Sequence, residues 1–310
     1  MKSFTSNNYV QREEELCFRT KRITKLLLPT TKVERLIFNL NKNAFIYWCD
    51  EVDIRTGRVG STPVTVRIGI DFNGAKRNMS IINHENKLTS FDREIHDAIA
   101  SFYSVNHESY CTPKMLLRIL TGRSDIKISN SIEKAIWQSI EKMRNTELKI
   151  DATNETVTFR QENFIYCGSL LPSEQTAAIR INNTLVSDCI HIRSTPLFEY
   201  AVKRDQISSV DIEMLGVPLR HTIEDFSIRG YLLRELLWMK HKRSKRSPVV
   251  LYKTLFEYLG INTSKADDNL RHYIMRCRKK VGRCLDFWEK KGFINGYQEE
   301  DRSVRIIIKL

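Results

Sequence analysis

The sequence lacks the features of a secreted or membrane-spanning chain. It has no uninterrupted apolar run of about 18 residues, the length that a helix needs to cross a bilayer. Its start, MKSFTSNNYVQREEELC, lacks the apolar core of a signal peptide. Its seven cysteines are an odd number without the spacing of a disulfide framework, which is typical of a reducing compartment. We therefore expect a cytoplasmic protein with no membrane partner.

The sequence also lacks the common catalytic motifs. There is no His-Glu-x-x-His, no Gly-x-x-x-x-Gly-Lys-Ser/Thr and no Gly-x-Ser-x-Gly, which argues against a zinc metalloprotease, a P-loop ATPase and an α/β-hydrolase. A nicking enzyme of the rolling-circle type needs a His-x-His pair, and His191-Ile192-Arg193 has the wrong third residue. We expect no catalytic residue, no metal and no cofactor, so the protein is not expected to be an enzyme.

What the chain does have is positive charge, concentrated near its end. The 310 residues carry a net charge of +13. From Arg229 to Leu310 there are 20 Lys and Arg against 9 Asp and Glu, whereas the preceding residues hold 30 against 28. Such a localised excess favours a polyanion as partner, nucleic acid above all, over a merely solvated basic surface.

One predicted helix concentrates these charges, within RHYIMRCRKKVGRCLDFWEKKGFI, residues 271–294. We expect it to begin near Ser264 and to end near Gly292. At helical spacing one sector is apolar and comprises Leu270, Ile274, Cys277, Val281, Cys284, Leu285 and Trp288. The opposite sector comprises His272, Arg276, Lys279, Arg283 and Lys290.

Three other interpretations of this helix are less well supported. Cys277 and Cys284 lie seven residues apart with no further ligand pair, which does not match the usual zinc spacings. A membrane-surface helix fits poorly, because the apolar sector is needed for the core of a small domain. A solvated basic face remains the alternative to a helix that contacts phosphates.

Two segments of the chain share one order of elements: a helix, a second helix that starts at a Ser/Thr-Pro pair and ends at glycine, a long helix and a hairpin. In the first segment these are a helix at 88–105, a helix from Thr112-Pro113 to Gly122, a helix from a possible Asn130–Glu133 capping box and a hairpin at 148–160. In the second they are a helix leading from Phe226, a helix from Ser247-Pro248 to Gly260, the basic helix and strands at 293–297 and 303–309. A basic helix followed by a hairpin is typical of a winged helix-turn-helix.

We therefore predict an α+β protein with two tandem winged helix-turn-helix domains and a small β-containing N-terminal region. The predicted boundaries are 1–87 for the N-terminal region, 88–225 for the first winged domain with a β-rich extension, and 226–310 for the second. The extension is expected to contain strands at 163–171, 176–182 and 189–193 and a helix from Thr195-Pro196, and residues 64–72 are expected to form a strand before a turn at Asn73-Gly74.

The first long helix has a mixed outward face. Lys134, Gln138, Glu141 and Asn145 share it, and they could contact either DNA or a protein partner, which the resemblance described below makes a second copy of the chain. Asp92, His96 and Asp97 lie close together on the helix at 88–105. We expect a surface ion pair or a helix-start acid cluster there rather than half a metal site.

A run of cations at residues 241–246 precedes the second domain's Ser247-Pro248 pair. It could be a basic helix end favoured by the helix dipole. We favour a phosphate clamp, because the following helix N-terminus points at the same region.

The pattern resembles the tandem winged-helix replication initiator proteins of bacterial plasmids and related mobile elements. The resemblance covers about residues 88–310 and is carried by four stretches: residues 91–99, Thr112-Pro113, residues 230–234 and residues 287–294. It implies sequence-specific binding to repeated sites on double-stranded DNA at a replication origin. It further implies host replication proteins as partners and a monomer–dimer balance tied to autoregulation.

On this interpretation the cations divide into two sets. His272, Arg276, Lys279 and Arg283 are expected to face the major groove, where arginine reads guanine best. Phosphate contacts are expected from Lys242, Arg243, Lys245, Arg246 and Lys290. A winged-helix transcription regulator is the runner-up, and an RNA-binding or structural protein is disfavoured because the basic face has no interleaved aromatics.

The acidic segment Glu299-Glu300-Asp301 departs from the pattern of the resembling family. It falls at the tip of the predicted hairpin beside the basic helix, where it would repel phosphates. We therefore expect this hairpin tip to lie away from the DNA backbone.

Overall fold

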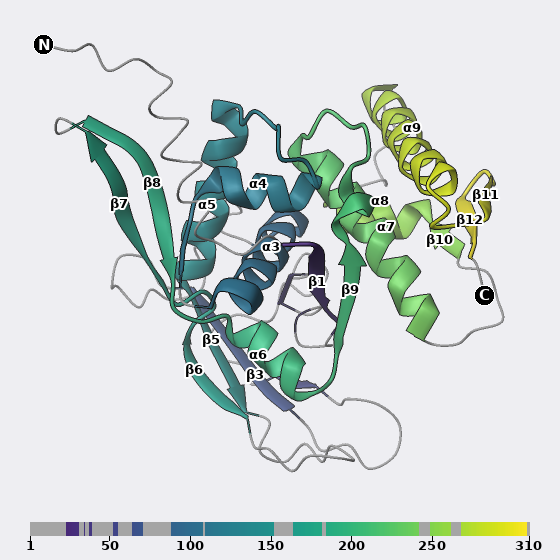
Figure 1. Ribbon diagram of the computed structural model, residues 1–310. Coiled ribbons are helices and arrows are strands. Elements are labelled where there is room, and N and C mark those ends of the chain that lie inside the picture. The colour runs from purple at the N-terminus through teal and green to yellow at the C-terminus, as the bar shows by residue number, and fades with distance from the viewer. Residues whose placement is uncertain are drawn as a thin grey trace, which may run out of the picture.

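The structure is a mixed α+β protein, described from a computed structural model (Figure 1). The residues that it describes are 23–30, 34, 37–38, 52–54, 64–70, 88–107, 109–151, 164–181, 184–241, 249–261 and 268–308. Buried apolar side chains form one hydrophobic cluster that extends from Leu26 to Ile306.

A first unit begins with three helices and ends in a long hairpin. Its elements are α3 (Ser90–Asn106), β4 (Ser109–Cys111), α4 (Pro113–Thr121), α5 (Asn130–Arg144), β7 (Ser173–Ile181) and β8 (Thr184–Ile192). The short strand β4 pairs with β8, which gives a sheet with the order β4-β8-β7.

A second unit repeats this arrangement. Its elements are α7 (Ile223–His241), β10 (Val249–Leu251), α8 (Tyr252–Tyr258), α9 (Asp268–Lys290), β11 (Gly296–Glu299) and β12 (Ser303–Ile307). Here too the short strand after the first helix pairs with the last strand, and the sheet order is β10-β12-β11. The β7–β8 hairpin and α9 lie on opposite sides of the molecule (Figure 1).

The predicted hairpin at 148–160 does not take part in this repeat. Its first part is β5 (Thr146–Asp151), the third strand of the sheet β2-β3-β5-β6, and Leu148 and Ile150 are fully buried in it. The other strands of that sheet are β2 (Val52–Ile54), β3 (Val64–Ile70) and β6 (Ile165–Ser169). The predicted turn at Asn154 and Glu155 lies outside the described residues. The hairpin that pairs with the short strand β4 of the first unit is β7–β8, which follows β5 and β6 in the chain.

Helix starts follow the predicted cap chemistry only in part. The helix at Pro196–Lys203 begins after Thr195 as expected, but the Thr195 side chain makes no capping hydrogen bond. Thr89 caps α3 in a capping box with Asp92, and Thr112 caps α4 with Pro113 at its first position. The box predicted from Asn130 is wrong, because the cap of α5 is Ser129, whose hydroxyl accepts from the backbone N–H of Ile132 at 3.4 Å. The helix predicted to begin at Pro248 begins instead at Tyr252, after the strand β10.

The earlier and later parts of the chain share sheets. The strand β1 (Lys25–Pro29) pairs with β9 (Ile207–Asp211), and the β1 residue Leu27 donates its backbone N–H to the Ser101 hydroxyl of α3 at 2.7 Å. Between the units run α6 (Pro196–Lys203), β9 and the 3-10 turn η3 (Ile212–Leu215). The proposed domain boundaries after residues 87 and 225 stay predictions.

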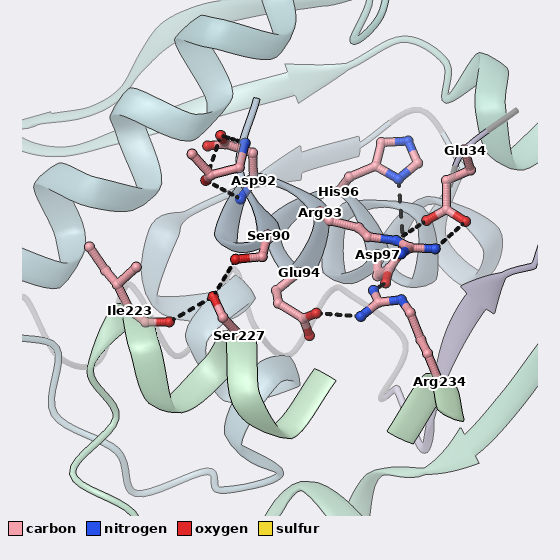
Figure 2. Close-up of polar contacts among 11 residues, drawn as sticks. Glu34, Ser90, Asp92, Arg93, Glu94, His96, Asp97, Ile223, Ser227 and Arg234 are labelled. Atoms are coloured by element: carbon pink, nitrogen blue, oxygen red, sulfur yellow. Dashed lines mark hydrogen bonds and ion pairs between the residues drawn. The ribbon is translucent and has the colours of Figure 1, made fainter. Parts of the chain in front are cut away.

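A buried charge cluster joins the two units where α3 packs against α7 (Figure 2). The guanidinium of Arg234 on α7 donates to Glu94 and to Asp97, both on α3. Burial alone would lower the pKa of Arg234, but the carboxyl groups of Glu94 and Asp97 together raise it. Beside this contact, Arg93 of α3 donates to both oxygens of Glu34, at 2.8 and 3.0 Å (Figure 2).

The surface location expected for Asp92, His96 and Asp97 is wrong. Their exposed fractions are 1%, 0% and 0%, because β1, α4, α5 and α7 all pack around α3. Asp92 accepts from the hydroxyl of Ser139 and from the ammonium of Lys142 on α5. The acid cluster therefore joins helices to one another instead of facing solvent.

Close packing between the units also requires glycine and aromatic residues. A Cβ at Gly230 of α7 would lie 1.8 Å from a carboxylate oxygen of Glu94, so α3 and α7 approach only because this position lacks a side chain. The indole of Trp288 on α9 donates to the carbonyl oxygen of Met214 in η3 at 2.9 Å. Arg229 of α7 donates to the carbonyl oxygen of Leu215 at the same distance.

We predict that Arg234→Ala destabilises the protein by about 3–5 kcal/mol, because it leaves Glu94 and Asp97 buried without their cation. The matched control is Arg193→Ala, which breaks an exposed ion pair with Glu174 and is expected to change stability by less than about 1 kcal/mol. Urea unfolding followed by circular dichroism measures both. Equal small losses would show that the Arg234 cluster does not hold the units together.

Candidate nucleic-acid interface

The helix α9 buries most of the apolar sector expected from its spacing, while Leu270 and Ile274 of that sector are half-buried. Cys277, Val281, Cys284, Leu285 and Trp288 are each at most 1% exposed. The helix ends at Lys290, and Gly292 follows with φ +73, a conformation that favours glycine. The expected start at Ser264 lies outside the described residues. Burial of this stripe fixes which side of α9 faces outward.

The outward side of α9 carries the cations that the sequence singled out. The side chains of His272, Arg276, Lys279, Arg283 and Lys290 are all exposed. Arg276 lies over the ring of Tyr273, with 5.8 Å between the guanidinium carbon and the ring centroid. Within the described ranges, no acidic side chain pairs with Lys279 or Arg283. The structure thus brings four cations and His272 onto one helix face, and at least two of the cations are available to a partner.

Other cations of α9 hold the second unit together. Lys280 contacts Glu224 and Asp225 near the start of α7, at 3.1 and 2.8 Å. Burial opposes ionisation of Asp225, but the hydrogen bonds from Lys280 and Thr222 leave its pKa below the ordinary value. These groups on the inner flank of α9 therefore fix its angle to α7.

The hairpin tip is anchored by its own acidic residues. Glu299 accepts from the hydroxyl of Tyr252 at 2.7 Å, and Glu300 accepts from the hydroxyl of Ser303 at 2.9 Å. Arg278 of α9 donates to the backbone carbonyl of Asp301, and its guanidinium lies 4.6 Å from the ring centroid of Tyr252. Sequence reasoning assigned no role to Arg278, although its helical spacing places it beside the apolar sector and apart from the exposed cations. These contacts give the acidic segment a structural role beside α9.

The corresponding helix of the first unit, α5, exposes the mixed set that the sequence indicated. Lys134, Gln138, Glu141 and Asn145 are exposed. Asn145 ends the helix, and its backbone N–H donates to the carbonyl oxygen of Glu141 at 2.9 Å. This face lacks the uniform positive charge of the α9 face, so its charge does not decide whether it contacts DNA or a second copy of the chain.

Four predicted phosphate contacts lie outside the described residues. They are Lys242, Arg243, Lys245 and Arg246, in the segment between α7 and β10. Their assignment stays a prediction from the sequence.

The described part of the chain holds neither a metal-binding cluster nor a membrane-spanning helix. No group of three or more His, Cys, Asp or Glu side chains there could hold a metal ion. None of the helices described is both long and apolar enough to cross a membrane.

Comparison with known proteins gives a remote structural likeness. No protein-family model matches the sequence, and no curated protein matches it. Two crystal structures of domains 2 and 3 of RctB are among the solved structures that this chain is similar to. The first is 12% identical in sequence, and the match covers 89% of this chain and 98% of the RctB chain. The second is 13% identical, and the match covers 84% of this chain and 91% of the RctB chain. Both have a TM-score of 0.43, and a likeness of this degree assigns no function.

We predict that the hairpin tip lies away from bound DNA. Asp301→Asn removes an exposed negative charge and should leave both the affinity and its salt dependence unchanged. Lys279→Ala, on the exposed face of α9, should reduce the slope of log K against log salt by about one. Fluorescence anisotropy over a salt series measures both. Tighter binding by Asp301→Asn would place the tip beside phosphates.

Proposed function

We propose that the chain is a DNA-binding protein without catalytic activity that lays α9 in the major groove of double-stranded DNA. The observation that carries this proposal is the exposed cationic face of α9, held outward by a fully buried apolar stripe. A helix with its axis in the groove presents one face to base edges and its flanks to phosphates. His272, Arg276, Lys279 and Arg283 are the proposed groove-facing residues, and Lys290 is a proposed phosphate contact.

We further propose that the two units are tandem winged helix-turn-helix domains. The order of helix, short strand, two helices and hairpin, with the short strand paired to the last strand, supports this; in the first unit β5 and β6 are inserted before the hairpin. The hairpins β7–β8 and β11–β12 are then the wings. On this proposal α5 is the first unit's equivalent of α9.

The finer proposal is a plasmid-type replication initiator, which acts in the cytoplasm at repeated origin sites and regulates its own gene. The sequence resemblance over residues 88–310 and the paired units support it. The mixed face of α5 suits a homodimer contact or a second DNA contact, and host replication proteins are the further partners proposed. A winged-helix transcription regulator is the second candidate, since it would use the same α9 face.

The first test is fluorescence-anisotropy binding to the DNA that flanks the protein's own gene, against a random duplex, over a salt series. A preference of about a thousandfold or more with a steep salt slope is expected of a specific binder. Footprints at several direct repeats would favour the initiator over the regulator. Equal weak binding to both duplexes would leave only a polyanion binder, and no binding to either would refute the DNA interface.

We predict different effects from two kinds of cation. Arg276→Ala or Arg283→Ala should lower the discrimination between cognate and random duplex by about 1–3 kcal/mol, because a base contact is lost. Lys245→Ala should weaken binding to both duplexes alike, because a phosphate contact carries no sequence information. Competition titrations with the two duplexes measure this. The groove assignment is wrong if all three variants behave alike.

A further inference from the structure

An apolar side chain borders the cationic face of α9. Met275 is 51% exposed, and its helix-surface neighbours at positions −4, −3, +3 and +4 are Arg271, His272, Arg278 and Lys279. Arg276 follows it directly. Six other large apolar side chains are as prominently exposed among the described residues, and none of them is on α9: Tyr110, Ile165, Val202, Ile223, Val249 and Leu251.

A single exposed apolar residue needs no explanation by itself. The position of Met275 along α9 points to a role in base recognition, because the N-terminal part of a recognition helix contacts base edges. Met275 is the eighth residue of the 23 in α9. At ~1.5 Å per residue, Arg283 lies about 12 Å and Lys290 about 22 Å farther along the axis. Met275, His272 and Arg276 therefore form the part of the face that would lie deepest among bases.

The major groove displays one apolar group, the C5-methyl of thymine. The cations of α9 can bind guanine or phosphate, but they gain little from a methyl group. A methionine thioether is unbranched and adaptable, so it can pack on a methyl group between polar contacts. Met275 is the one side chain on the exposed N-terminal half of α9 with this chemistry, among those that the structure describes as at least half exposed.

We propose that Met275 is a specificity-determining residue that recognises a thymine methyl group next to the base contacted by Arg276. This inference rests on the proposed function, because it requires α9 to lie in the major groove. It specifies that function further: the recognised sequence contains a thymine within about one base pair of a guanine, since Arg276 is the adjacent arginine.

The test replaces single thymines by deoxyuridine, which removes only the methyl group. The protein first selects its own site from a random pool of duplexes, and each thymine of that site is then exchanged in turn. Wild-type protein should lose about fourfold in affinity at one or two thymines, the loss expected for one buried methyl group. The same exchange should change nothing for Met275→Ala or Met275→Gln.

Two further variants separate this role from a general surface effect. Met275→Leu keeps an apolar side chain of similar volume and should keep most of the sensitivity to the methyl group. Val202→Ala shortens an equally exposed apolar side chain on α6, away from α9, and should bind every duplex like wild type. Because both sites are half exposed, folding should be unaffected, which thermal unfolding checks.

The outcomes distinguish this inference from the proposed function. If no duplex is selected over random DNA, the proposed function fails and takes the inference with it. If a site is selected but no thymine exchange matters, the role of Met275 is refuted while the DNA interface stands. Methyl sensitivity that persists unchanged in Met275→Ala refutes it equally. Sensitivity lost in Met275→Ala and Met275→Gln and kept in Met275→Leu supports it.

Discussion

The placement of the two units depends on one buried contact, Arg234 of α7 between Glu94 and Asp97 of α3. Buried ions are costly to remove from water, so such a contact stabilises less than its geometry suggests, and its main effect is to reject other arrangements. Any sliding of α7 along α3 would leave carboxylates without their cation. Gly230 reinforces this restriction, because only at a residue without a side chain can α7 approach Glu94 so closely.

Further contacts connect the α3–α7 contact to α9 and orient the exposed face of that helix. Trp288 binds the connecting turn η3, and Lys280 binds the acids at the start of α7. Arg278 binds the hairpin tip and packs on Tyr252. The cations of α9 thus fall into two groups with different tasks. Lys280 and Arg278 on its flanks are paired within the protein and orient the helix, whereas Lys279 and Arg283 on its outer face pair with no acidic side chain among the described residues.

Much of α9 could be predicted from the sequence, because helical period alone separates Trp288 and Cys284 from Arg276 and Arg283. Caps at Thr89 and Thr112 were equally predictable, since they depend on residues within one turn. The burial of Asp92, His96 and Asp97 could not be predicted, because it results from packing against α5 and α7, which are distant in sequence. The identity of the hairpin in the first unit could not be predicted either. Residues 148–160 have strand character, but only the pairing of β4 with β8 shows which hairpin completes the unit.

The exposed faces of α9 and α5 differ in charge, and the buried contact between α3 and α7 fixes how these two faces are placed. A cationic α9 supplies the affinity for a polyanion, while the mixed face of α5 supplies little on its own. If α5 also contacts DNA, it does so at a distance from α9 that Arg234, Glu94 and Asp97 fix. Two half-sites would then be bound with one preferred spacing, because changing it would require separating α3 from α7 and leaving their charges unpaired. Discrimination between DNA sites would come from the spacing of the two half-sites as well as from base contacts. A weakly charged α5 would then contribute to specificity while adding little affinity.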